Sequence, residues 1–193
     1  MTQLSLTGIE GPLARTDGLF FAAVPTPEAA AQIEQRAQDF RRELGLKGRP
    51  LATEQLHITL YYLGAHAGMP LGIVAKASET AAAVRMAPFE VAFDRATSFA
   101  GKAGSRPLVL CNSKPLAALN AFQQTLRTAI KKAGLDNWTQ PSFTPHVTLL
   151  YDRRGVPQQD VEPVSWTVRE FLLVRSLHGM SRHETLARWP LQG

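Results

Sequence analysis

Residues 56–62, which read Leu-His-Ile-Thr-Leu-Tyr-Tyr, return almost unchanged at residues 145–151 as Pro-His-Val-Thr-Leu-Leu-Tyr. Side chains of an extended chain point alternately to opposite faces, so His57 and Thr59 share one face of a strand. The apolar residues that alternate with them share the other face. Each copy therefore predicts a strand with a polar pair on one side and an apolar pair on the other.

The similarity extends well beyond these two stretches. Shifting the chain by 89 positions aligns residues 19–62 with residues 108–151 without a gap. Both segments contain an apolar run, a helical pattern and then the histidine strand, and the helical patterns end at Gly45 and Gly134. Such an internal duplication, present in two copies, indicates two pseudo-symmetric lobes rather than a solenoid.

Local signals predict the remaining elements. In the first unit Thr26 is a suitable N-cap and Pro27 suits the first helical position, and in the second unit a helix starts at Pro115. Alternation and turn residues predict one further helix over 71–84, strands over 89–93, 166–168, 171–174 and 185–189, loops over 97–107 and 152–163, and a turn over 178–184.

The composition is that of a globular protein, with 45% hydrophobic and 19% charged residues. We expect residues 18–193 to form a single bilobal domain after a loose tail at 1–17. The net charge of +5 and the pI near 9.7 favour an anionic partner such as a nucleotide or RNA, unless the charges serve only solubility.

Cysteine content and hydropathy indicate the compartment. The single cysteine, Cys111, excludes an internal disulfide and a cysteine-based zinc cluster, and it fits a reducing cytosol. The opening residues lack the apolar core of a secretory signal, and no stretch approaches the roughly 20 apolar residues of a membrane helix. We therefore expect a cytoplasmic protein without membrane association.

The duplicated polar face predicts a reactive site. Approximate two-fold symmetry would place His57 opposite His146 and Thr59 opposite Thr148. Because the unperturbed histidine pKa is about 6.5, one imidazole can act as a base and the other as an acid near neutral pH. Displacement at phosphorus needs both functions, on opposite sides, and hydroxyl groups that donate to the phosphate oxygens. Four residues thus form a candidate phosphodiesterase site that needs no metal.

Three other interpretations of the two histidines have less support in the sequence. A zinc site would need three or four ligands, and no third histidine or carboxylate has a suitable spacing. A serine nucleophile would need an elbow such as Gly-x-Ser-x-Gly, which is absent from the sequence. A purely architectural repeat would have to place both histidines and both threonines on a polar face without a chemical reason.

These motifs resemble those of the two-histidine phosphoesterases, and in particular the bacterial and archaeal 2′-5′ RNA ligase-like proteins, also called RNA 2′,3′-cyclic phosphodiesterases. The resemblance covers nearly the whole chain and includes the opening residues 19–25, Leu63-Gly64 and the ending at 188–191. It implies a bilobal α+β fold with two antiparallel sheets that face a central cleft and helices on the outer faces. It also implies opening of a terminal 2′,3′-cyclic phosphate to give a 2′-phosphomonoester.

The resemblance also implies roles for individual residues. His57 would be the general acid for the leaving 3′ oxygen, and His146 the base that activates water. Many relatives carry a basic residue where this chain has Tyr151, so Arg153 is our candidate for the phosphate contact.

Strand parity and context suggest roles for the other aromatic residues and histidines. Parity places Tyr61 on the face of His57 and Thr59, where it could stack on a base. The same parity assigns Tyr62 and Tyr151 to core packing. Three further histidines lack a partner motif and are interpreted as solvated loop residues: His66, His178 and His183.

The sequence therefore predicts a monomeric cyclic phosphodiesterase acting on RNA or nucleotide ends, without metal or cofactor. Two alternatives remain open at this point. The same site could work in reverse as a 2′-5′ RNA ligase, or the protein could be an RNA-binding module without turnover.

Overall fold

We determined the architecture from a computed structural model, which describes residues 16–102, 104–137, 142–180 and 182–193. Most of the predicted tail lies outside the described residues. Its last two residues, Thr16 and Asp17, belong to the first strand, and the Asp17 carboxylate accepts hydrogen bonds from the side chain of Arg175. No helix within the described ranges is long and apolar enough to cross a membrane.

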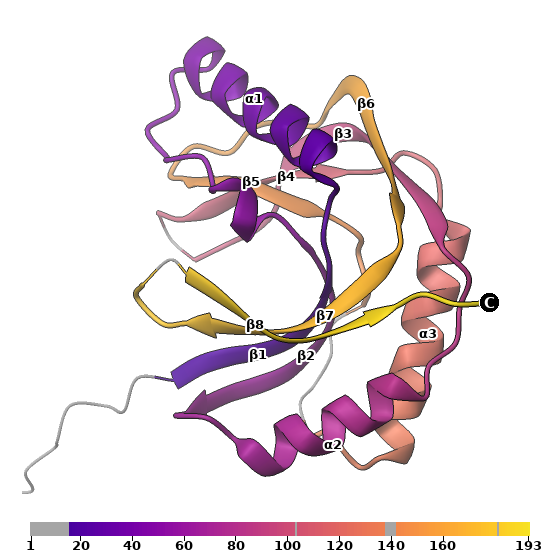
Figure 1. Cartoon of the computed structure of the whole chain (residues 1–193). Coiled ribbons are helices and arrows are strands. Elements are labelled where there is room, and N and C mark those ends of the chain that lie inside the picture. Colours follow the sequence, from indigo (N-terminus) through magenta and orange to yellow (C-terminus); the bar gives the residue numbers. More distant parts are fainter. Residues whose placement is uncertain (1–15, 103, 138–141, 181) are drawn as a thin grey trace, which may run out of the picture.

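The described chain folds into two four-stranded sheets in which every pair of neighbours is antiparallel (Figure 1). The first sheet has the order β2-β1-β7-β8, with bounds Ile58–Ala67, Thr16–Ala23, Glu170–Leu177 and Arg182–Pro190. The second has the order β5-β4-β3-β6, with bounds Val147–Asp152, Arg106–Cys111, Phe89–Ser98 and Gln159–Val168. The α+β class with two antiparallel sheets is confirmed.

Three α-helices and one short 3-10 helix join the strands: α1 Pro27–Glu43, η1 Thr53–Gln55, α2 Leu71–Ala82 and α3 Ala117–Lys132. Helix α1 begins as expected, because the Thr26 hydroxyl accepts a hydrogen bond from the Ala29 amide at 3.3 Å. Gly45 and Gly134 follow α1 and α3 with φ of 62° and 65°, a conformation that favours glycine at helix ends.

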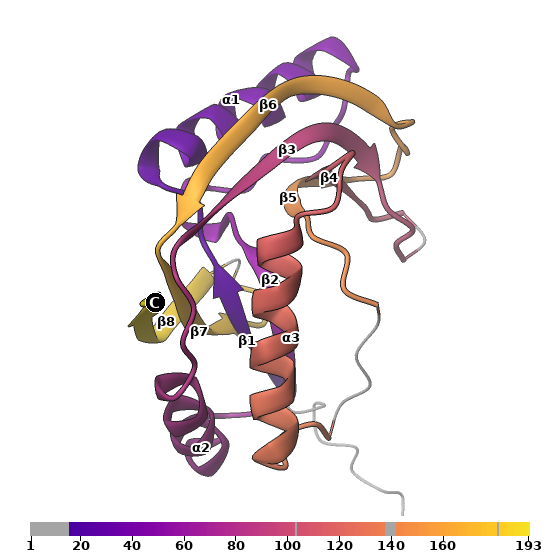
Figure 2. The same ribbon diagram turned by 90° about the vertical axis from the view of Figure 1, so that its right-hand side faces the viewer.

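Helix α1 packs on the sheet of the other unit, and α3 packs on both sheets. Helix α1 follows β1 but contacts β5 and β6, while α3 follows β4 and contacts β2 as well as β3. Figures 1 and 2 show α1 along the second sheet, and α2 and α3 together at the opposite end of the molecule. The two halves are therefore interlocked, and one continuous core joins them.

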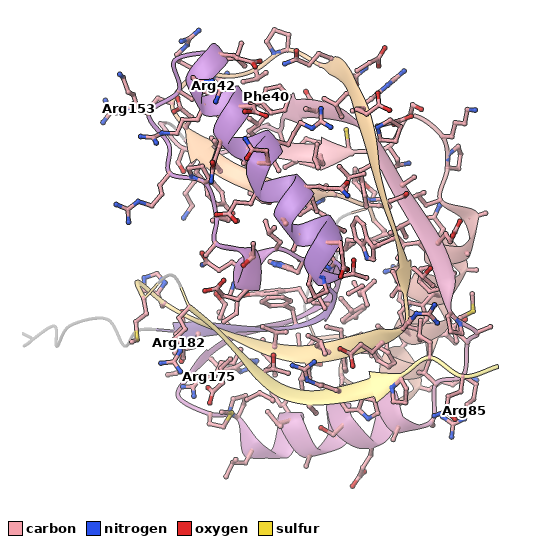
Figure 3. All side chains as sticks on the ribbon, turned by 45° about the horizontal axis from the view of Figure 1, so that its top comes forward. Phe40, Arg42, Arg85, Arg153, Arg175 and Arg182 are labelled. Carbon is pink, nitrogen blue, oxygen red and sulfur yellow. The ribbon has the colours of Figure 1, made fainter. Side chains whose placement is uncertain are left out.

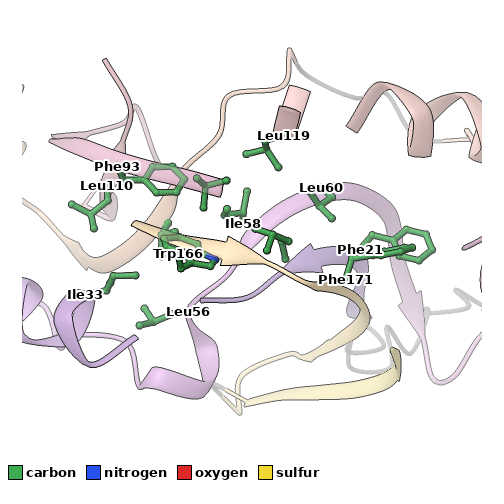
Figure 4. Packing of buried hydrophobic residues seen from close by; sticks show 14 of the residues in the cluster. Phe21, Ile33, Leu56, Ile58, Leu60, Phe93, Leu110, Leu119, Trp166 and Phe171 are labelled. Atoms are coloured by element: carbon green, nitrogen blue, oxygen red, sulfur yellow. The ribbon is translucent and has the colours of Figure 1, made fainter. Parts of the chain in front are cut away.

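That core lies between the helices and the sheet faces that point away from the histidine cavity. Its largest fully buried side chains include Phe21, Phe93, Phe122 and Phe171, and Figure 4 shows Phe21 and Phe171 close together beside the strands. A separate small cluster, Phe20, Ala22, Leu172 and Val174, covers the other face of the first sheet. The first sheet is thus apolar on both faces, which allows its second face to form a sheltered site.

Several predicted boundaries were wrong in the second half of the chain. Residues 159–163, expected in a loop, are the start of β6, and the expected turn at 178–184 ends where β8 begins at Arg182. The segment 171–174, predicted as a strand, lies in β7 of the first sheet. Pairing across the sheets decided these assignments, and local alternation carries no information about the partner strand.

Both histidine strands contain a β-bulge at the same position. In the pairing of β1 with β2, Ala22 faces Thr59 but Phe21 faces Tyr61, so β2 has one extra residue. In the pairing of β4 with β5, Val109 faces Thr148 but Leu108 faces Leu150. A bulge reverses which side chains point to which face beyond it. The bulge therefore reverses the predicted faces of the residues that follow Leu60 and Leu149, and in β2 this holds up to a second register shift between Tyr62 and Gly64.

Candidate active site

The two histidines are held in the same way. Each lies directly before its strand, and its Nδ1 lies 2.7 Å from a backbone oxygen two residues earlier, that of Gln55 for His57 and that of Thr144 for His146. A carbonyl oxygen only accepts hydrogen bonds, so Nδ1 carries the hydrogen in both rings. The Nε2 atoms are left to give or take a proton, which is the arrangement that acid-base catalysis requires.

A cavity of about 360 Å³ brings the four predicted polar residues together. His57 and Thr59 line it from the first sheet, and His146 and Thr148 line it from the second. The remaining lining residues come from the loop before η1, from η1, and from β5, β7 and β8: Leu51, Gln55, Tyr151, Ser176, Arg182 and His183. The two duplicated strands thus contribute to one site, as the two-fold argument predicted.

Arg182 and His183 are lining residues that the sequence reasoning missed. His183 was interpreted as a solvated loop histidine, but it lies in β8, and its ring centroid is 5.0 Å from that of His57 in an edge-on arrangement. These residues have no counterpart in the duplicated unit, which was the signal that identified the other four. The β7–β8 hairpin brings them to the cavity, and only its pairing with β1 makes this visible.

A phenylalanine ring packs against each of the two histidines. The ring centroids of Phe20 and His57 are 5.0 Å apart, and those of Phe99 and His146 are also 5.0 Å apart. Phe20 lies 5.6 Å from His183 as well, so the first histidine is enclosed by two rings. These contacts restrict the orientation of both imidazoles and exclude water from one side of each.

The enclosure changes the acidity of His57. The pKa of His57 is lowered from 6.5 to about 4. The main cause is burial, which disfavours the charged imidazolium; the hydrogen bond to the Gln55 carbonyl opposes it, and the nearby His183 and His146 add to it. Burial also lowers the pKa of His183. In the free protein His57 is therefore neutral at pH 7, with Nδ1 protonated and Nε2 available as an acceptor.

The predicted faces of the tyrosines were wrong because of the bulges. Tyr61 was expected on the polar face, but its residue is only 2% exposed and belongs to the main core. Tyr62 and Tyr151, expected in the core, point the other way: Tyr62 packs against the Phe20 cluster, and Tyr151 is 50% exposed and lines the cavity. The extra residue in each strand shifts the alternation by one.

Arg153 does not line the cavity that holds the histidines. It is exposed beyond the end of β5, and Figure 3 shows it beside the carboxyl end of α1, away from Arg182. Arg182 is the arginine in the lining. The cation in the lining therefore comes from β8, and not from the segment after β5 in which Arg153 was chosen.

A second cavity of about 490 Å³ adjoins the first and shares Thr59 and His146 with it. Its wall contains the aromatic residues Tyr62, Phe99 and Phe143, and the mostly buried Tyr61 also contributes. Aromatic surfaces of this kind stack on nucleobases. The two cavities together offer a polar place for a phosphate and an aromatic place for a nucleoside.

The described residues contain no group of three or more His, Cys, Asp or Glu side chains arranged to hold a metal ion. Cys111 is partly buried in β4, and burial raises the pKa of its thiol.

Known proteins are similar to this chain in both sequence and fold. A model of the 2′-5′ RNA ligase superfamily matches residues 21–180. The RNA 2′,3′-cyclic phosphodiesterase of Escherichia coli strain K12 is 31% identical over 181 residues, which cover 90% of this chain and 96% of that protein.

Two solved structures have a fold similar to that of this chain. A phosphoesterase matches with a TM-score of 0.74 at 28% identity, over 92% of this chain and 99% of that chain. Apo LigT of E. coli matches with a TM-score of 0.72 at 28% identity, over 93% and 99%. LigT has also been solved in complexes with 3′-AMP and with phosphate, at 27% identity and a TM-score of 0.68 over 93% and 99%.

Proposed function

The chain belongs to the 2′-5′ RNA ligase superfamily, and we propose that it hydrolyses 2′,3′-cyclic phosphate ends of RNA or nucleotides to 2′-phosphomonoesters. The observation that carries this proposal is the cavity in which His57, Thr59, His146 and Thr148 meet. The name of the E. coli relative and the 3′-AMP and phosphate complexes of LigT support a phosphate ester on a nucleoside as the substrate.

In the proposed reaction the two imidazoles act on opposite sides of phosphorus. His146 takes a proton from the attacking water through Nε2, and His57 gives a proton to the leaving 3′ oxygen. His57 must then be protonated in the complex. A phosphodiester anion bound beside the ring favours the imidazolium and opposes the effect of burial on the pKa. Substrate binding would therefore favour protonation of His57, so that the general acid carries its proton when the substrate is bound.

The remaining cavity residues bind the phosphate. The hydroxyl groups of Thr59 and Thr148 donate to its non-bridging oxygens, where negative charge accumulates in the transition state. Arg182 supplies the positive charge in this proposal, in place of Arg153. Tyr62 and Phe99 replace Tyr61 as the surfaces on which the terminal base stacks. We expect a cytoplasmic monomer that needs no metal or cofactor.

Product analysis of an oligonucleotide with a 2′,3′-cyclic phosphate end tests the activity directly. We expect a 2′-phosphomonoester as the product, formed at an equal rate with and without EDTA. An intact end after long incubation, together with salt-dependent RNA binding, would favour an RNA-binding module instead. A strict metal requirement would contradict the two-histidine mechanism.

A substrate with sulfur at the bridging 3′ position separates the two histidine roles. A thiolate leaves without protonation, so it restores turnover to a variant that lacks only the general acid. We expect this substrate to restore His57→Ala and to leave His146→Ala impaired. The opposite pattern would exchange the two roles and match the neutral state of His57 in the free protein.

Ligation is the second candidate, because the family model is that of a 2′-5′ RNA ligase superfamily. The same histidines could join a cyclic phosphate end to a 5′ hydroxyl that takes the place of water: the base removes the hydroxyl proton, the 5′ oxygen bonds to phosphorus, and the 3′ oxygen leaves with a proton from the acid. Measuring hydrolysis and joining on one substrate, with and without an added 5′-hydroxyl strand, decides between them. A joining rate above the rate of hydrolysis would make the protein a ligase.

A further inference from the structure

We propose that four cations beside the end of β5 bind the phosphates of single-stranded RNA that leads to the cyclic end. This cationic surface consists of Arg41, Lys47, Arg49 and Arg153. The inference rests on the proposed function and deepens it, because it makes an oligonucleotide, and not a mononucleotide, the preferred substrate of the site.

The four cations have no competing partner. All four side chains are exposed, and none of them forms an ion pair with a residue that the structure describes. The adjacent Arg42 differs, since it lies 2.7 Å from Asp39 and 3.9 Å from Glu43. Exposed cations without carboxylate partners keep their full charge for an anionic ligand.

Three of these cations line one hollow. A cavity of about 570 Å³ is bounded by Arg41, Lys47 and Arg49 together with Arg42, and Glu34 is the acidic residue in its lining. Its volume suits one or two nucleotide units. A hollow that is mainly cationic and has no aromatic lining residue suits a sugar-phosphate backbone better than a base.

A buried carboxylate fixes this surface in place. Asp152 is 7% exposed, and its Oδ2 accepts hydrogen bonds from the amides of Lys47 and Gly48 at 2.6 and 2.7 Å. Its Oδ1 accepts from the Arg154 amide at 2.8 Å, and the Arg154 guanidinium donates to the Leu44 carbonyl at 2.7 Å. The loop before η1 and the turn after β5 are thereby held together.

Close backbone packing adds to this fixation. A side chain at Gly48 would overlap the carbonyl oxygen of Tyr151, so the loop can lie against β5 only with glycine at this position. The Leu51 amide also donates to the Leu149 carbonyl at 2.8 Å. A cationic loop that is ordered before binding loses less conformational entropy when RNA binds.

The cationic surface lies beside the proposed catalytic cavity, because neighbouring residues of the chain line the two. Leu51 follows the loop and Tyr151 precedes Asp152, and both line the cavity that contains the histidines. Figure 3 shows Arg42 and Arg153 together at the carboxyl end of α1, while Arg85 lies at the opposite end of the molecule. An RNA strand with its cyclic end between the histidines can therefore place the preceding phosphates on this surface.

The test compares the triple variant Lys47→Ala, Arg49→Ala, Arg153→Ala with the wild type on two substrates. These are a cyclic mononucleotide and a ten-residue RNA with a 2′,3′-cyclic phosphate end. We expect the ratio of kcat/KM for the RNA over the mononucleotide to fall roughly tenfold or more. The matched control Lys76→Ala, Lys131→Ala, Lys132→Ala removes the same charge from exposed positions of α2 and α3 and should keep the wild-type ratio.

Binding of the same RNA to a His146→Ala protein gives a second readout that does not need turnover. The slope of log affinity against log salt should become shallower by about 2 when the three cations are removed, since each single-strand phosphate contact contributes roughly 0.7. Equal losses in the control variant, an unchanged ratio, or a wild type that prefers the mononucleotide would overturn the inference. If the wild type hydrolyses neither substrate, the proposed function fails, and the binding slope still decides whether this surface holds RNA.

Discussion

The two histidine strands have the same backbone but different surroundings. In both strands, the four residues after the histidine are buried, partly buried, buried and buried in turn. Both strands have their bulge at the leucine after the threonine, and both histidines have Nδ1 at 2.7 Å from a backbone carbonyl oxygen. However, His57 lies against Phe20 and His183, while His146 lies against Phe99. The duplicated segments thus define the geometry, and the strands outside them define the electrostatics.

The sheets show where this difference arises. The strand orders β2-β1-β7-β8 and β5-β4-β3-β6 are equivalent, so β8 corresponds to β6. Strand β8 sends Arg182 and His183 into the cavity, whereas no residue of β6, which the structure describes in full, lines it. A symmetric duplication therefore produces an asymmetric site, and a reaction that needs one acid and one base requires such asymmetry.

The largest expected effect comes from removing either imidazole. Replacing His57 or His146 by Ala should lower kcat for a 2′,3′-cyclic nucleotide by about 10²–10⁴-fold, the usual loss when an acid or base is absent. Steady-state kinetics on both variants measure this. His178→Ala, at an exposed histidine, is the matched control and should keep wild-type activity. Full activity of His57→Ala or His146→Ala would show that the replaced histidine is not a catalytic acid or base.

The threonines test whether both strands bind the same phosphate. Thr59→Val and Thr148→Val keep the shape of the side chain and remove the hydroxyl, so each should lower kcat by roughly 10²–10³-fold, as for the loss of one oxyanion donor. Thr125→Val on the exposed side of α3 is the control. A loss confined to one threonine would mean that only one lobe contacts the phosphate.

The acidity of His57 predicts a pH dependence of stability. Its pKa is about 4 when folded and about 6.5 when unfolded, so the unfolded chain binds more protons between these values. This contribution is fully present above pH 6.5 and is lost as the pH falls toward 4, by about 3 kcal/mol in total. Urea unfolding at several pH values should show the loss in the wild type and a smaller loss in His57→Gln. Equal pH slopes for the two proteins would contradict a buried neutral His57.

The smallest expected effect concerns Tyr61 and Tyr62, the two tyrosines that follow the bulge in β2. Tyr62→Ala should weaken nucleotide binding by roughly 1–3 kcal/mol through lost stacking. Tyr61→Ala should instead lower the free energy of unfolding, because it removes a buried ring from the core. Nucleotide titration and urea unfolding of both variants separate the two outcomes, and the reverse assignment would mean that the bulge does not direct these side chains.

The sequence predicted much of the site because the site is duplicated. His57, Thr59, His146 and Thr148 were identified from their spacing alone, and all four line one cavity. Helix α1 was predicted from its cap and its apolar stripe, which are local signals. Tyr61, Tyr62 and Tyr151 were placed on the wrong faces, since a bulge depends on the hydrogen bonds of the neighbouring strand and not on the residues of the strand itself.

By itself the sequence determined the elements, the class of fold and the chemical groups of the site, because capping, periodicity and repetition act within a short stretch of chain. Only the tertiary structure decided the pairing of β7 with β1 and of β8 with β7, the position of His183 beside His57 and the placement of Lys47 and Arg49 next to β5. These features join residues far apart in the chain. Their formation depends on strand pairing and burial, which are properties of the packed molecule.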